Sequence, residues 1–94
     1  MHIRRYACRS ELAPVLEAAL AANGYTIEIP YQENSKGDGA LVMTQGSASV
    51  LLSQEAARNQ CEIDIWGEAQ HTAAVLLESL PLDIEKLPTL HAEN

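Results

Sequence analysis

The feature that most constrains the fold is a change of hydrophobic period at Gly67. In the segment before this glycine, CEIDIW (61–66), apolar and polar residues alternate, which is the period of a half-buried β-strand. Such a strand sends its two sets of side chains to opposite faces: Cys61, Ile63 and Ile65 on one, Glu62, Asp64 and Trp66 on the other. After Gly67 the apolar spacing becomes that of an amphipathic helix, at Ala69, Ala73, Leu76, Leu77 and Leu80.

The same helical spacing occurs once more, near the start of the chain. It links five apolar residues: Leu12, Val15, Leu16, Ala19 and Leu20. Ser10 is placed to cap this helix, and Pro14 is tolerated only in the first turn. Asn23 and Gly24 end it, because glycine readily takes the left-handed conformation.

Strands are predicted over 2–7, 25–29, 40–44, 48–52 and 61–66, with a last edge strand over 82–87. The strand over 25–29 is expected to be half-buried and to end at Pro30, followed by a polar loop over 31–39. A longer connection is expected over 53–60, and fraying from Pro88 onward.

The predicted order is β-α-β-β-β-β-α-β in one domain spanning 1–94. This order predicts an α+β fold, a two-layer α/β sandwich. Its mostly antiparallel sheet would have five or six strands, with both helices on one face.

Composition narrows the classes of partner. Thirteen acidic residues against six basic ones give a net charge of −7, which argues against a nucleic-acid partner. No apolar run is long enough to cross a membrane, and MHIRRYACRS has no apolar signal segment, so a cytoplasmic protein is expected. The core of a chain this short is thin, which predicts a homodimer or another homo-oligomer.

Cys8 and Cys61 are too few to form a disulfide framework and are expected to be reduced. Cys61 is expected to be buried as a small hydrophobic residue. Cys8, in the predicted turn from strand to helix, is expected to be exposed and is the candidate reactive thiol, because a helix N-terminus lowers a thiol pKa. The three histidines show no metal-ligand spacing, so neither a metal site nor a cofactor is predicted.

The candidate ligand site lies on the polar side of the strand over 61–66. Glu62 and Asp64 stand about 6.5–7 Å apart along it, and Glu28 would join them if its strand were a neighbour. Trp66 could contact an organic cation through its ring face. Two interpretations stay open: a cation-binding site, or simply a solvated face of the sheet.

From Leu16 to Leu80 the chain resembles the bacterial S-adenosylmethionine decarboxylases, small pyruvoyl enzymes with an α/β sandwich fold. The segments that carry the resemblance are GYTIEI, GDGALVMTQGSASVLLS and CEIDIWGEAQHTAAVLLESL. Asp64 would match the aspartate of the family's late strand, and Gly67 the glycine before its last helix.

The catalytic motifs of that family are not retained. The serine that becomes the pyruvoyl group would fall near Ser47, but Gly46 and Ala48 replace the flanking glutamate and histidine. Leu52 stands where the processing histidine is expected, and Trp66 where the resemblance implies a catalytic cysteine. The resemblance therefore implies a protein without decarboxylase activity.

Three hypotheses about function remain. The first is a non-catalytic or repurposed decarboxylase-like acidic protein that binds a small ligand or a partner protein, with the polar sheet face as the surface. The second is an enzyme acting on S-adenosylmethionine or a polyamine-like cation without a pyruvoyl cofactor. The third is an unrelated small α/β protein-interaction domain. The first is favoured, because no complete catalytic set can be assembled.

Overall fold

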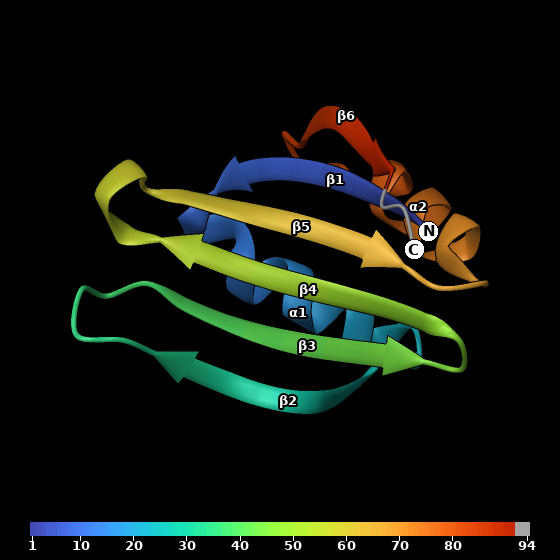
Figure 1. Cartoon of the computed structure of the whole chain (residues 1–94), viewed down its shortest axis with the longest axis horizontal. Coiled ribbons are helices and arrows are strands. Elements are labelled where there is room, and N and C mark those ends of the chain that lie inside the picture. The colour runs from blue at the N-terminus through green and yellow to red at the C-terminus, as the bar shows by residue number, and fades with distance from the viewer. Residues whose placement is uncertain (92–94) are drawn as a thin grey trace.

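The computed structural model describes residues 1–91, which form one antiparallel sheet covered on one face by helices (Figure 1). Its six strands lie in the order β2-β3-β4-β5-β1-β6 within these residues. Their bounds are β1 His2–Arg9, β2 Thr26–Glu33, β3 Gly39–Gln45, β4 Ala48–Glu55, β5 Gln60–Trp66 and β6 Glu85–His91. The helices are α1 Ala13–Ala22 and α2 Gln70–Ser79. The predicted α+β sandwich is confirmed.

The sheet combines a meander of β2 to β5 with two further strands, β1 and β6, beside β5. Strands β2 to β5 follow one another in space as they do in sequence, each antiparallel to the next. Strand β1 then lies between β5 and β6, so the first and last strands of the described chain are hydrogen-bonded neighbours. Residues separated by most of the sequence are thereby brought together.

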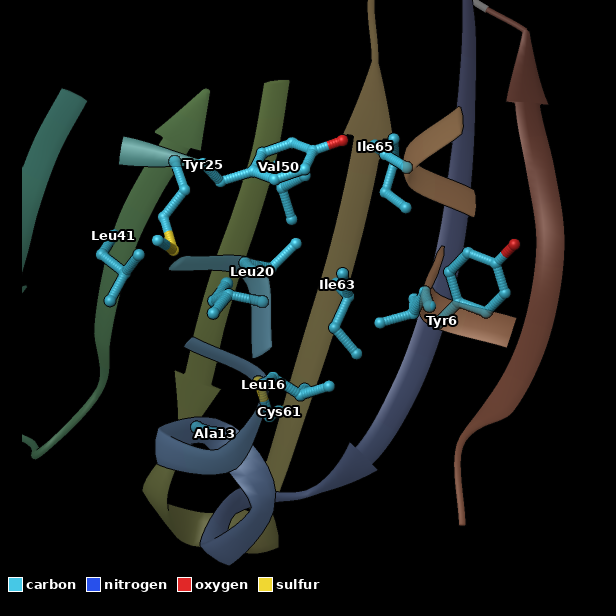
Figure 2. Packing of buried hydrophobic residues seen from close by; sticks show 14 of the residues in the cluster. Tyr6, Ala13, Leu16, Leu20, Tyr25, Leu41, Val50, Cys61, Ile63 and Ile65 are labelled. Carbon is cyan, nitrogen blue, oxygen red and sulfur yellow. The ribbon is translucent and has the colours of Figure 1, made fainter. Parts of the chain in front are cut away.

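The core lies between the sheet and the two helices (Figure 2). The apolar residues of β5 lie at the centre of this core: Cys61 and Ile63 are fully buried and Ile65 nearly so. Leu16 and Leu20 of α1 and Leu77 of α2 close over them from the helix layer. The predicted helix-facing set of β5 is therefore confirmed.

Two strand ends differ from prediction because Pro30 and Pro88 lie inside strands. Strand β2 continues through Pro30 to Glu33, and β6 runs through Pro88 to His91. Both are edge strands, where a missing backbone N–H leaves no ladder bond unmade. All residues of β2 are exposed, so the expectation of a half-buried strand is wrong. Of the predicted fraying segment, residues 92–94 lie outside the described part of the chain.

The connection predicted over 53–60 is shorter than expected. Strand β4 continues to Glu55, a single 3-10 turn follows at Ala56–Arg58, and β5 begins at Gln60. Asn59 completes the turn in the left-handed conformation, with φ 51°. Ser10 hydrogen-bonds to the side chain of Asn59 and does not cap α1, whose N-cap is Leu12.

Gly67 is required by the backbone where the period changes. Its φ is +102°, in the region that favours glycine. A Cβ at this position would collide with the backbone carbonyl oxygen of Ser47. The chain can therefore turn from β5 towards α2 only with a glycine here.

Candidate functional site

The side of the sheet away from the helices, here called the open face, carries the candidate ligand residues of β5. Glu62, Asp64 and Trp66 share this face, opposite the buried Cys61 and Ile63. All three are half-buried, although no helix covers them (Figure 1). The structure thus places them on one face, as the alternation predicts.

Arg5 of β1 is the residue that organises this cluster. It stands directly opposite Asp64 in the β1–β5 pair. Its guanidinium donates two hydrogen bonds to Glu62, from Nη2 to Oε1 at 3.2 Å and from Nε to Oε2 at 3.4 Å. Its Nε lies 4.0 Å from Asp64 Oδ1. The hydrogen bond to Glu62 is the main reason that the pKa of Arg5 is raised.

Asp64 is the least satisfied member of the cluster. Its Oδ1 is buried and has no hydrogen-bond partner among the described residues. Burial, and then the hydrogen bond and charge of Glu62, raise the pKa of Asp64 from 3.8 to about 7. The pKa of Glu62 is lowered, first by hydrogen bonding with Asp64 and further by Arg5. The pair therefore tends to hold a proton on Asp64 while Glu62 stays ionised.

This arrangement leaves little room for an external cation. The guanidinium of Arg5 already lies where the acid pair would hold a positive ligand group. A hollow of about 280 Å³ borders Glu62, together with Asp38 and Ser53, but its lining includes neither Asp64 nor Trp66. A cationic ligand would therefore have to displace Arg5 before it could contact both carboxylates.

Glu28 does not join the cluster. It lies on β2, and strands β3 and β4 separate β2 from β5. At about 4.8 Å between neighbouring strands, this places the two strands about 14 Å apart. The condition on which Glu28 was included, a neighbouring strand, is therefore not met.

The expectation that Cys8 is exposed is wrong. Strand β1 continues two residues beyond its predicted end, so Cys8 lies within the strand and is only 8% exposed. It faces Cys61 across the β1–β5 pair, and both thiols are free. Burial raises the pKa of Cys8, and burial together with Cys8 raises that of Cys61 to about 12. Neither thiol is thus an activated nucleophile.

Two groupings could not be read from the sequence. Arg5 is 57 residues from Glu62, and only the register of β1 on β5 reveals the contact. The three histidines lie far apart in sequence yet line one hollow. Within residues 1–91, no group of three His, Cys, Asp or Glu side chains is arranged to hold a metal ion.

Comparison with known proteins finds no matching family model, no matching curated protein and no matching solved structure. No helix among the described residues has the length and apolar character needed to cross a membrane. Functional inference for this chain therefore starts from its own geometry.

Proposed function

We propose that the chain is a non-catalytic binding protein whose open face pairs with the open face of a second copy. The observation that carries the proposal is the buried Asp64 Oδ1, an acceptor without a partner on a sheet face that no helix covers. An unmade hydrogen bond at a buried polar atom costs about 1–3 kcal/mol. A donor from a second molecule would remove that cost.

One row of residues across the open face, here called the central row, has a self-complementary pattern. The strand registers align its six members, one from each strand, in the order Leu87, Arg5, Asp64, Leu51, Val42 and Ile29. Its only two ionisable side chains, Arg5 and Asp64, are neighbours and have apolar residues on both sides. Such a row can pair with its own copy.

A two-fold axis parallel to the strands, between β1 and β5, satisfies this pattern. It would place Arg5 of one copy over Asp64 of the second, and Leu87 over Leu51. A rotation of the carboxylate, whose side chain is 23% exposed, would then let this arginine donate to the oxygen that lacks a partner among residues 1–91. Face-to-face sheets in sandwiches pack with aligned strands in the same way.

A dimer about this axis overlaps four strands of each copy, β4, β5, β1 and β6, because β2 and β3 lie beyond the edge of the partner's β6. Four strands spaced about 4.8 Å apart, each seven or eight residues long at about 3.4 Å per residue, cover roughly 500 Å² in projection. Standard interfaces bury about 800 Å² on each partner. Side-chain relief adds to the projected area, so such a dimer would approach the lower end of this class, about 600 Å² on each partner.

The kinship with S-adenosylmethionine decarboxylases remains a proposal, supported by the element order and by Asp64 and Gly67. The enzyme alternative, acting on S-adenosylmethionine or a polyamine-like cation, is less well supported because Arg5 occupies the acid pair. Ser47, where that family forms its electrophile, lies exposed in the turn between β3 and β4. The proposed function therefore stays with binding.

Sedimentation velocity on three proteins tests the proposal. We expect the wild type to sediment as a dimer of the 10.2 kDa chain at micromolar concentration. Leu51→Glu, in the middle of the central row, should raise the dimer dissociation constant by at least about 100-fold, since it buries an unpaired charge. Val75→Glu, at a 53% exposed position on α2, should leave it unchanged.

A charge exchange gives a second, independent test. Arg5→Asp and Asp64→Arg should each weaken the dimer, and the double variant should recover much of the affinity because both pairs are restored in reversed order. Circular dichroism of each variant controls for folding. A wild type that stays monomeric near millimolar concentration would refute the proposal.

A further inference from the structure

The three histidines of the chain meet at one corner of the fold. His2 begins β1, His91 ends β6 and His71 lies in the first turn of α2, and Figure 1 shows these elements together. They line a hollow of about 600 Å³, here called the histidine pocket. His2 and His91 are opposite each other across the β1–β6 pair, with ring centroids 4.4 Å apart in an edge-to-face arrangement.

Gln70 fixes this corner. Its side-chain amide donates to the backbone carbonyls of His2 and Gly67, at 3.2 Å in both cases. These bonds tie the first turn of α2 to the start of β1. His71, the next residue on α2, is thereby held beside the two histidines of the sheet. The pocket is thus built by tertiary hydrogen bonds and does not depend on the open face.

Hydrogen-bond donors dominate the lining of the histidine pocket. Arg4 and Lys86 contribute a guanidinium and an ammonium group, and Thr89 contributes a hydroxyl. Arginine and lysine side chains can only donate, and imidazole donates from both nitrogens when protonated. Among residues 1–91, the only carboxylate in the lining is that of Glu68. A lining of this kind matches a ligand with several acceptor oxygens.

Carboxylates beside the pocket balance its two fixed cations. Glu78 lies beside it, accepting a hydrogen bond of 2.6 Å from Tyr6 and standing 3.9 Å from Lys86. The Tyr6 hydrogen bond is the main reason that the pKa of Glu78 is lowered. Glu68 in the lining is the second carboxylate near Arg4 and Lys86.

We propose that the histidine pocket binds a small multivalent oxyanion of the phosphate type. The histidines, Arg4 and Lys86 would supply charge-assisted hydrogen bonds to its oxygens. A metal ion is a poorer match, because both fixed cations repel it and no three ligands converge within residues 1–91. The chain has a net charge of −7, so a hollow lined mainly by hydrogen-bond donors differs from the acidic character of the rest of the sequence.

The test is a titration of tag-free protein with inorganic phosphate and pyrophosphate at constant ionic strength. Imidazole carbon-bound protons are followed by NMR, which reports each histidine separately. We expect saturable shifts of the His2, His71 and His91 signals, with pyrophosphate the tighter ligand.

Matched variants locate the site. His71→Gln and Lys86→Gln, both at exposed positions, should each weaken pyrophosphate binding by about 5-fold or more. Arg58→Gln, in the turn between β4 and β5, removes one positive charge elsewhere and should not change it. Shifts that do not saturate, an equal loss in Arg58→Gln, or shifts abolished by EDTA would each overturn the proposal.

Discussion

The two faces of β5 follow the same sequence alternation but differ in what covers them. Cys61, Ile63 and Ile65 are sealed under α1 and α2, in a core that contains no charged side chain among residues 1–91. Glu62 and Asp64 lie on the face without helices and form an internal charge cluster with Arg5. On the covered face, no buried side-chain polar atom of residues 1–91 lacks a hydrogen-bond partner, whereas on the open face Asp64 Oδ1 lacks one. The incomplete face is where binding is expected.

The largest effect should come from the covered face. Ile63→Ala should lower the free energy of unfolding by about 2–5 kcal/mol, because it leaves a cavity in a fully buried site. Leu51→Ala on the open face, measured where the chain is monomeric, should cost less than half as much. Urea denaturation measures both. Equal losses would show that the two faces are packed alike.

The thiols of the covered face should be strongly protected. Burial raises the pKa of both Cys8 and Cys61, so native protein should react with iodoacetamide at least about 100-fold more slowly than urea-unfolded protein. Mass spectrometry of each cysteine over time gives the two rates. Rapid labelling of Cys8 in the folded protein would show that this thiol is exposed and reactive, which would contradict its buried position in β1.

A smaller, pH-dependent effect should come from the open face. The folded-state pKa of Asp64, about 7, lies above its ordinary value of 3.8, so the folded chain binds the extra proton between these limits. This contribution to stability is fully present below pH 3.8 and is lost as the pH rises through about 7. Asp64→Asn keeps a neutral group there and should be more stable than wild type by about 1–2 kcal/mol near pH 8.

The advantage of Asp64→Asn should fall to roughly a third of this near pH 5 and disappear below pH 3.8. Working between pH 5 and pH 8 separates this effect from Glu62, whose lowered pKa affects stability only in more acidic solution. Dilute protein keeps association out of the comparison. Parallel stability curves for the two proteins would show that the carboxyl of Asp64 titrates normally.

Local patterns predicted most of the fold. The change of period at Gly67, the two amphipathic helices and the alternation in β5 depend on neighbouring residues, and each is confirmed. Strand ends were predicted less well, because they depend on position in the sheet. Pro30 is tolerated because β2 is an edge strand, and Cys8 is buried because β5 continues beside β1 as far as Gln60.

The sites depend on strand register, which a single sequence does not reveal. Arg5 could be matched to Glu62 and Asp64 only once β1 was placed between β5 and β6. The same placement brings His2 beside His91. In both cases the residue types were visible in the sequence, and what was missing was which strands are neighbours.

The most direct test of the central claim is an isotope-filtered NOE experiment on an equal mixture of labelled and unlabelled chains. Only contacts between copies give signals in such a sample. The account predicts NOEs between copies from the methyl groups of Leu51 and Leu87 on the open face. Contacts that instead involve Val15 and Val75 on the helix layer, or no contacts at high concentration, would contradict it.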